Sequence, residues 1–323
     1  MAFPHLRSIE RAPAPEGEAM LDCALTLIAA TDSETLIETA ASAAREALTN
    51  LGARVGQPDW LAPRKALDLF FADVTLDQAD VGMRALLAKR FPGAKLDLVV
   101  QEAADRRKRL VVADLESTLI ENEMLDELAE FIGVRDKVAE ITRRAMNGEI
   151  DFATALKTRV ALFKGLPEAA LGEAAARIRL MPGASVLIAT SHAHGARVAL
   201  VTGGFSVFAR HVQRMLDFDV VIANELIIES GRLTGTVREP IVTREGKEAA
   251  LISLAAEHGV PRRLTLAIGD GANDLPMLEA AGLGVAFHAK PAVAERARTR
   301  LDYCDLTALL YAQGYRATEF AAA

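Results

Sequence analysis

The sequence has few of the features that mark disulfide-rich, membrane-spanning or nucleic-acid-binding proteins. Its two cysteines, Cys23 and Cys304, lie far apart and lack metal-site spacing, which argues against a disulfide framework and a zinc site. No apolar run is long enough to span a bilayer, and residues 1–7 do not resemble a signal peptide, so we expect a cytoplasmic protein without a membrane partner. The formal net charge of -7 argues against a nucleic-acid partner.

The chain has enough apolar residues to form more than one hydrophobic core. Hydrophobic residues make up 51% and charged residues 25% of 323 residues, which is typical of two or three globular units. After a loose leader, apolar runs alternate with helical patterns, which predicts a small α/β domain over residues 1–105. The apolar runs are 23–29, 66–71 and 96–100, and the helical patterns are 31–51 and 77–90. The basic stretch 105–109 is expected to be a linker.

Three later apolar runs each end abruptly in polar residues. Residues 110–113 precede Asp114, residues 198–201 precede Thr202, and residues 264–268 precede Gly269. Such runs, followed by helical patterns, indicate parallel strands buried on both faces. The sequence therefore predicts an α/β fold with a doubly wound, mostly parallel sheet, whose polar strand ends meet at one site.

We assign this core to residues 106–121 and 179–323. The helical stretch 122–178 between its first two strands is too long for an ordinary connection, so we expect a helical cap over the strand ends. Residues 220–242 alternate apolar and polar side chains around Ser230-Gly231 and are predicted to form a hairpin.

Several residues at the strand ends suit phosphoryl transfer. Asp114 and Glu116 leave the sheet edge together, so one carboxylate can attack while the other handles protons. A solvated loop or a helix cap remains the alternative for this pair alone. Thr202 and Gly203 offer a hydroxyl and backbone N–H groups to a phosphate, although the same residues would also be typical of a tight turn without a ligand. Lys247 supplies a positive charge, but a lone helical lysine usually faces solvent.

The glycine-rich stretch 269–277 is the most informative. It contains Asp270, Asn273 and Asp274 directly after a predicted buried strand. Carboxylate and amide oxygens of this kind suit Mg²⁺, whereas a calcium loop of the helix-loop-helix type would need more acidic positions. The stretch therefore predicts a magnesium site.

Taken in order, these segments resemble the motifs of the haloacid dehalogenase superfamily and, more narrowly, of the phosphoserine phosphatase family. The matching segments are Asp114-Leu-Glu-Ser-Thr, Thr202-Gly-Gly-Phe, Lys247 and Gly269-Asp-Gly-Ala-Asn-Asp. The resemblance implies that Asp114 is the nucleophile, forming an aspartyl-phosphate, and that Glu116 is the acid/base residue. It implies Mg²⁺ ligands from Asp114, Asp270 and the Glu116 backbone carbonyl, with Asp274 orienting the metal's water shell. The implied phosphoryl-binding residues are Thr202, Gly203, Lys247 and Asn273.

The cap resembles the same family and carries the argument about substrate. By that resemblance Glu123 binds the substrate ammonium and Arg159 grips its carboxylate, while Met146 and Phe152 line the pocket. Taken without the family, Glu123 and Arg159 would be ordinary surface charges. The implied activity is hydrolysis of L-phosphoserine to L-serine and phosphate, the last step of serine biosynthesis.

Two alternatives stay open at this point. The chain could act on another small phosphorylated metabolite, as a phosphatase or phosphotransferase, or it could be a catalytically impaired amino-acid sensor. The family usually has Asp where this chain has Glu116, and the added methylene predicts that Glu116→Asp would be faster. For the amino-terminal domain, regulation by a ligand, stabilisation and formation of a homodimer all remain open.

Overall fold

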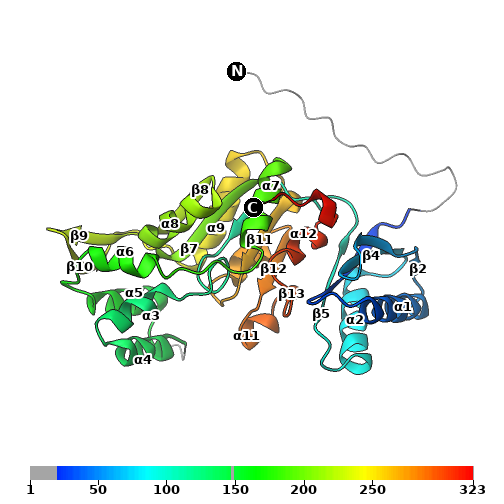
Figure 1. Ribbon diagram of the computed structural model, residues 1–323, viewed down its shortest axis with the longest axis horizontal. Coiled ribbons are helices and arrows are strands. Elements are labelled where there is room, and N and C mark those ends of the chain that lie inside the picture. The colour runs from blue at the N-terminus through cyan, green and yellow to red at the C-terminus, as the bar shows by residue number, and fades with distance from the viewer. Residues whose placement is uncertain (1–19, 147–148, 323) are drawn as a thin grey trace, which may run out of the picture.

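The computed structural model describes residues 20–146 and 149–322. The chain forms an amino-terminal sheet with two helices, a central sheet flanked by helices, and a group of helices at the end farthest from the amino-terminal sheet (Figure 1). No helix in the described part of the chain is both long and apolar enough to cross a membrane.

The amino-terminal sheet is antiparallel, in the order β2-β4-β1-β5, with β3 paired to β4. Its strands are β1 (Cys23–Ala29), β2 (Arg54–Val55), β3 (Asp59–Ala62), β4 (Ala66–Ala72) and β5 (Leu96–Glu102). The helices α1 (Glu34–Asn50) and α2 (Leu76–Arg90) lie on one face (Figure 1). The sequence predicted both helices and the three long strands. It missed β2 and β3, because runs this short carry no readable alternation.

The central sheet is parallel throughout, in the order β13-β12-β11-β6-β7-β8. Its strands are β6 (Leu110–Ala113), β7 (Arg197–Phe205), β8 (Val220–Asn224), β11 (Thr265–Gly269), β12 (Leu283–Phe287) and β13 (Thr299–Leu301). The prediction of a hairpin over residues 220–242 is wrong for its first part, because β8 pairs with β7 inside this sheet. The doubly wound parallel sheet predicted from the buried apolar runs is confirmed.

Helices cover both faces of the central sheet. They are α7 (Ala184–Ala193), α8 (Ser206–Leu216), α9 (Arg244–Glu257), α10 (Leu275–Ala280), α11 (Pro291–Ala294) and α12 (Ala308–Ala312), with single 3₁₀ turns η1 (Arg262–Leu264) and η2 (Ala317–Glu319). Side chains that alternate along β6 enter two different cores. Val111 and Ala113 pack in one cluster, and Leu110 and Val112 pack in another. Burial on both faces accounts for the unbroken apolar run of this strand.

The lid is the helical segment inserted between β6 and α7. It consists of α3 (Met124–Phe131), α4 (Arg135–Met146), α5 (Phe152–Ala161) and α6 (Ala169–Ala175). A hairpin from the core, β9 (Leu226–Glu229) with β10 (Arg232–Val237), reaches this segment. The Gly165 N–H donates to the Leu233 carbonyl at 2.8 Å, and the Leu233 N–H donates to the Leu166 carbonyl at 2.9 Å. Backbone hydrogen bonds therefore tie one side of the lid to the core.

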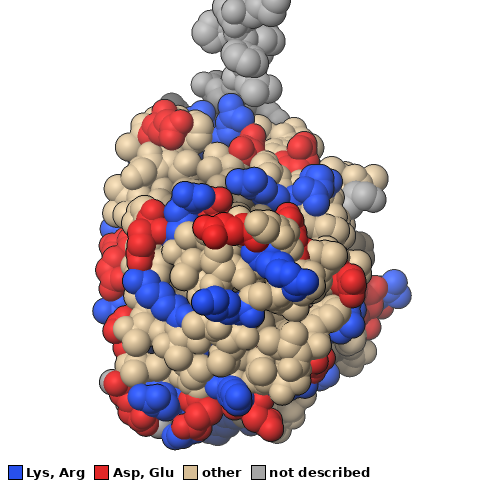
Figure 2. Space-filling model, turned by 90° about the vertical axis from the view of Figure 1, so that its left-hand side faces the viewer, with Lys and Arg blue, Asp and Glu red and all other residues tan. Residues whose placement is uncertain are grey.

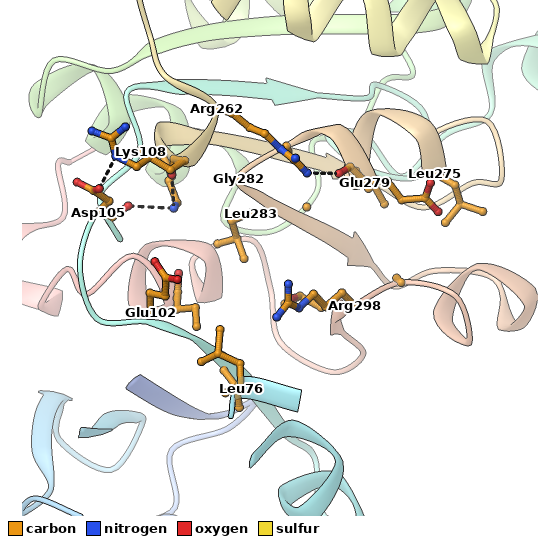
Figure 3. A pocket seen from close by; sticks show the side chains of 18 of the residues that line it. Leu76, Glu102, Asp105, Lys108, Arg262, Leu275, Glu279, Gly282, Leu283 and Arg298 are labelled. Carbon is orange, nitrogen blue, oxygen red and sulfur yellow. Dashed lines mark hydrogen bonds and ion pairs between the residues drawn. The ribbon is translucent and has the colours of Figure 1, made fainter. Parts of the chain in front are cut away.

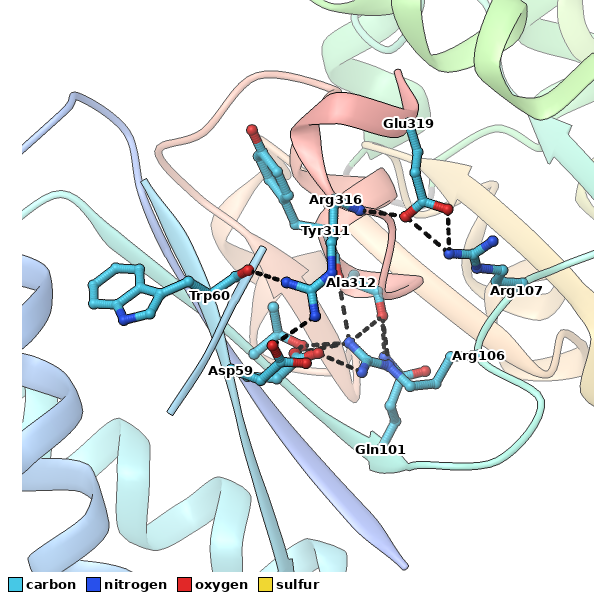
Figure 4. Close-up of polar contacts among 11 residues, drawn as sticks. Asp59, Trp60, Gln101, Arg106, Arg107, Tyr311, Ala312, Arg316 and Glu319 are labelled. Carbon is cyan, nitrogen blue, oxygen red and sulfur yellow. Dashed lines mark hydrogen bonds and ion pairs between the residues drawn. The ribbon is translucent and has the colours of Figure 1, made fainter. Parts of the chain in front are cut away.

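The amino-terminal sheet docks on the core through buried polar groups (Figure 4). The Arg106 guanidinium forms an ion pair with Asp68 of β4 at 2.6 Å and donates to the Ala312 carbonyl of α12 at 3.1 Å. Gln101 donates to the same carbonyl at 2.6 Å. Farther out, Arg316 pairs with Asp59 at 2.7 Å. The two sheets are thus joined by specific contacts as well as by the chain itself.

A cleft of about 560 Å³ remains beside this contact, between α2 and β5 on one side and α10 to β13 on the other. Glu102, Asp105 and Lys108 lie on one wall and Arg298 lies on the opposite wall (Figure 3). The Lys108 amine donates to the carbonyls of Asp105 and Arg263, both at 2.9 Å. Burial lowers the pKa of this amine to about 8.

Candidate active site

The candidate site lies at the carboxyl ends of three neighbouring strands. Asp114 directly follows β6, Asp270 directly follows β11, and Thr202 lies in the last part of β7. Since β6 is paired with both β11 and β7, these side chains come together at the centre of the sheet. The backbone holds the edge in register, because the Asp114 N–H donates to the Ile268 carbonyl at 3.0 Å. Parallel strand ends are the usual place for ligands in open α/β sheets.

Lys247 is the buried cation of the site. It lies in the first turn of α9, is 1% exposed, and forms ion pairs with Asp114 at 2.7 Å and Asp274 at 2.6 Å. Burial acts to lower the pKa of its amine, but the charges of the two carboxylates outweigh burial and raise it. Lys247 is therefore a fixed positive charge rather than a solvent-facing helical lysine.

Three buried carboxylates lie close together at this edge of the sheet. Asp114, Asp270 and Asp274 each place a ligand oxygen within 4.8 Å of the others. Burial, followed by repulsion from Asp114, raises the pKa of Asp270 to about 7 and that of Asp274 to about 6. Three carboxylates beside one buried lysine also leave the cluster with more negative than positive charge. An oxygen-lined cluster with excess negative charge fits a hard divalent cation such as Mg²⁺.

Two glycines leave room for the loop that carries these acids. A methyl group added at Gly269 would lie 2.4 Å from the Asp274 carboxyl carbon, and one added at Gly271 would lie 2.3 Å from the Asn273 side-chain oxygen. The Gly271 N–H also donates to Asp274 at 2.9 Å. Only glycine allows these close approaches, so the turn is built around the side chains of Asn273 and Asp274.

Glu116 points from the sheet edge toward the lid. One carboxyl oxygen accepts a hydrogen bond from the Met124 N–H, at the start of α3, at 3.0 Å. Burial, followed by the charge of Glu123, raises the pKa of the Glu116 carboxyl to about 8. A carboxyl that keeps its proton near neutral pH suits a general acid.

The turn at the end of β7 brings the lid and the core together. Thr202 accepts a hydrogen bond from the Gly204 N–H at 2.9 Å, which leaves its hydroxyl hydrogen available to a ligand. A methyl group added at Gly203 would lie 3.1 Å from the Phe152 ring, and one added at Gly204 would lie 3.1 Å from a Glu116 oxygen. The strand end, the lid aromatic and the Glu116 carboxyl are thus in close packing.

The lid supplies both charges that the sequence placed there. Glu123 is the N-cap residue of α3, and its carboxylate accepts a hydrogen bond from the Ser117 hydroxyl at 2.8 Å. Among the described residues, Arg159 on α5 donates hydrogen bonds only to the neutral oxygens of Thr142 and Ala155, each at 3.4 Å. Burial lowers the pKa of Arg159, and the negative charge of Glu116 is the largest effect that opposes the shift. In the described part of the chain, Arg159 forms no ion pair, so its guanidinium is free for an anionic partner.

Of Met146, the structure describes the backbone position. It is the last residue of α4, but its side chain lies outside the described residues, so its predicted pocket contact stays a prediction. Phe152 begins α5 and packs against the main core cluster.

The lid end of the molecule carries intermixed acidic and basic side chains (Figure 2). Any attraction of an anionic substrate must therefore come from local charges.

Three further residues contact the site although the sequence did not single them out. Asn224, at the end of β8, donates to the Gly203 carbonyl at 2.8 Å and accepts from the Val242 N–H at 2.7 Å. Ser117 fixes Glu123, as described above. Lys290 lies 3.7 Å from an Asp270 oxygen. Only Ser117 falls inside a recognised motif, whereas the other two depend on the packing of distant loops.

Comparisons with known proteins agree with this architecture. Residues 111–279 match the family described as haloacid dehalogenase-like hydrolase. A phosphoserine phosphatase from Streptomyces coelicolor is 43% identical over 289 residues, which cover 88% of this chain and 69% of that protein. The crystal structure of a probable phosphoserine phosphatase from Vibrio cholerae, in unliganded form, superposes with a TM-score of 0.71 at 31% identity. It covers 92% of this chain and 88% of that chain.

A third match concerns a reaction state. A structure described as a phospho-aspartyl intermediate analogue of phosphoserine phosphatase is 38% identical, with a TM-score of 0.60. It covers 64% of this chain and 98% of that chain. On the family match, on the relatives and on the sheet that places Asp114 beside Asp270, the chain belongs to the haloacid dehalogenase-like hydrolases and, within them, to the phosphoserine phosphatase family.

Proposed function

We propose that this chain hydrolyses L-phosphoserine to L-serine and phosphate, as in the last step of serine biosynthesis, with Mg²⁺ as its cofactor. The proposal rests on two groups of charged residues that lie next to each other. A buried acidic cluster with Lys247 lies at the sheet edge. In the adjoining lid lie Glu123 and Arg159, which forms no ion pair within residues 20–146 and 149–322. The first group suits a phosphoryl group with a metal ion, and the second suits the carboxylate and ammonium of an amino acid.

We assign the first step to Asp114 and Glu116. An Asp114 oxygen attacks phosphorus and forms an aspartyl-phosphate, while the bond from phosphorus to the serine oxygen breaks. Glu116 gives its proton to that leaving oxygen, which a pKa of about 8 supports. Lys247, Thr202, the Gly203 N–H and Asn273 hold the phosphoryl oxygens, so that the attacking and leaving oxygens stay aligned.

The second step regenerates Asp114. Glu116, now ionised, takes a proton from water, whose oxygen attacks phosphorus and releases phosphate from the Asp114 carboxyl. Asp114, Asp270 and the Glu116 carbonyl would hold Mg²⁺, with Asp274 orienting its water shell. When bound, the metal supplies positive charge that offsets the charge of the phosphoryl group.

In the proposed lid site, Arg159 binds the substrate carboxylate and Glu123 binds its ammonium, with Phe152 and Met146 closing the apolar side. Charge-assisted pairs of this kind select zwitterionic esters. We propose domain limits of 1–105 for the amino-terminal domain, 106–121 and 179–323 for the core, and 122–178 for the lid.

Phosphate release from three esters tests this function. Phosphoserine should be hydrolysed with a far higher kcat/KM than phosphoethanolamine, which lacks the carboxylate, or glycerol 3-phosphate, which lacks both charged groups. All activity should require Mg²⁺. Comparable rates on the three esters would favour a phosphatase of broader substrate range, and no release from any of them would favour a sensor.

A further inference from the structure

The loop between β12 and α11 reaches the candidate metal site from outside the recognised motifs. Lys290 contacts Asp270 twice, through its amine at 3.7 Å from a carboxylate oxygen and through its N–H, which donates to the Asp270 carbonyl at 3.4 Å. Of the two aspartates proposed as metal ligands, Asp114 pairs with the buried Lys247, whereas the ion pair of Asp270 is with Lys290. The position of this loop therefore bears directly on Asp270.

His288 fixes the loop in an uncommon conformation. Its φ angle is 44°, in the left-handed region that non-glycine residues seldom adopt. Two contacts hold it there. Its N–H donates to the Leu301 carbonyl at 2.9 Å, and its ring Nε2 lies 2.9 Å from the Cys304 carbonyl oxygen, which can only accept. Strain of this kind persists where surrounding contacts over-determine the backbone, and it is concentrated at functional sites.

The turn that receives His288 is itself held by the amino-terminal sheet. Asp97 of β5 is 3% exposed, and its carboxylate accepts three backbone N–H groups of the turn 302–304. The distances are 2.8 Å from Asp302, 3.1 Å from Tyr303 and 2.8 Å from Cys304. The Cys304 thiol also lies 3.7 Å from the Ile28 carbonyl of β1. A buried carboxylate with three such bonds is a rigid anchor.

These contacts form one continuous series from the amino-terminal sheet to the active site. Asp97 holds the backbone of Cys304, the Cys304 carbonyl holds His288, and the loop after His288 places Lys290 on Asp270. We propose that Asp97 and His288 are positioning residues for Asp270, so that docking of the amino-terminal sheet sets the affinity of the site for Mg²⁺. The inference rests on the proposed function in taking Asp270 as a metal ligand.

The size of the expected effect follows from the usual behaviour of groups that orient metal ligands. Loss of such a partner typically costs about 10-fold to 100-fold in metal affinity. Since His288 acts through Lys290 and a backbone contact, we expect the lower end of this range. Turnover at saturating Mg²⁺ should change little, because none of these residues contacts the reacting atoms.

The test uses the full chain and measures Mg²⁺ binding by calorimetry in the absence of substrate. His288→Ala should weaken Mg²⁺ binding about tenfold, and His288→Gln should restore most of it, because the Gln side chain can again donate to the Cys304 carbonyl. Asp97→Asn should weaken binding in the same direction. Asp59→Asn is the matched control, because Asp59 also joins the amino-terminal sheet to the carboxyl-terminal segment, through Arg316, but is not part of the series.

Hydrogen exchange provides a second readout that does not involve the metal. Amides of residues 287–290 should exchange faster in Asp97→Asn and His288→Ala than in the parent, and Asp59→Asn should match the parent. If Asp97→Asn fails to fold, the His288 pair decides alone, since it removes no contact between the sheets. Unchanged Mg²⁺ affinity in His288→Ala, or equal weakening in Asp59→Asn, would overturn the proposal. Both readouts work without phosphoserine, so they stand even if the proposed substrate is wrong.

Discussion

Buried charges occur in two regions of this chain, and they are balanced in only one of them. Where the amino-terminal sheet meets the core, Asp68 is 1% exposed and is matched by Arg106, which also binds backbone carbonyls. At the candidate active site, three buried carboxylates have one buried lysine beside them: Lys247 pairs with Asp114 and Asp274, whereas Asp270 lies 3.7 Å from the exposed Lys290. The interface is complete within the chain, whereas the active site has an excess of negative charge.

This difference in charge balance separates structural from functional buried charges. A matched pair is satisfied by its own partner and needs nothing from solution. In an unmatched cluster, burial and then mutual repulsion raise the pKa values of the carboxyls, as they do for Asp270 and Asp274, and the cluster costs stability until a cation binds. Substitutions in the two regions should therefore have opposite consequences for stability and for activity.

The largest expected effect is that of Asp114→Asn. Turnover of phosphoserine should fall by about 10⁴-fold or more, because an amide cannot attack phosphorus. The melting temperature should stay the same or rise, since the substitution removes one of the excess charges. Phosphate release and thermal unfolding measure the two effects. A phosphoprotein that hydroxylamine cleaves, found in this variant, would show that the nucleophile is another residue.

The interface should respond in the opposite way. Asp68→Asn leaves the buried Arg106 without a counter-ion and should lower the free energy of unfolding by about 3–5 kcal/mol. The exposed pair of Asp59 with Arg316 is the control, and Asp59→Asn should cost at most about 1 kcal/mol. Denaturant unfolding measures both variants. Similar costs for the two would mean that the Asp68 pair is no more important than a surface contact.

Metal ions should remove the imbalance. At 100 times its Kd, Mg²⁺ should raise the free energy of unfolding by about 2.7 kcal/mol, and a chelator should reverse this gain and abolish turnover. Asp270→Asn should lose most of the stabilisation by Mg²⁺. Potassium chloride at matched ionic strength is the control for general screening. Full turnover in excess chelator would remove the metal from the mechanism.

The lid extends the comparison with an unmatched positive charge. Arg159→Ala should lower kcat/KM for phosphoserine about 100-fold, or about 2–3 kcal/mol, because a charge-assisted contact is lost. Phosphoethanolamine, which has no carboxylate, should be affected much less. Lys157→Ala is the matched control on the same helix, because Lys157 is exposed and already paired with Glu239. Equal losses on both esters would make Arg159 a structural residue.

The smallest expected effect concerns Glu116. From the sequence alone, Glu116→Asp should be faster, since the family usually has Asp there. The bond from the Met124 N–H reverses that expectation, because the shorter side chain would withdraw from the lid helix. We expect kcat to fall about tenfold, as small displacements of an acid/base group are costly. A faster Asp variant in stopped-flow measurements of serine and phosphate release would restore the expectation from the sequence.

Sequence reasoning succeeded where the chemistry lies at strand ends. Asp114, Thr202 and Asp270 each follow or end a buried apolar run, and parallel pairing necessarily brings such ends together. Lys247 needed the resemblance, since nothing in its helix distinguishes it from a surface lysine. Asp97 and His288 could not be predicted from the sequence. Asp97 binds the Cys304 N–H, which lies 207 residues away, and this contact depends on how the two sheets dock. His288 contacts the Cys304 carbonyl 16 residues away, in the turn that Asp97 holds.

The Arg106 network also bears on the history of the chain. The phospho-aspartyl analogue structure aligns over 98% of its own length but only 64% of this chain, so a relative exists without a counterpart to the remainder. In this chain the added part is held by a buried contact, because Arg106 and Gln101 both donate to the Ala312 carbonyl of the core. Removing residues 1–105 would therefore expose a carbonyl and buried apolar groups that the shorter relative has no need to cover.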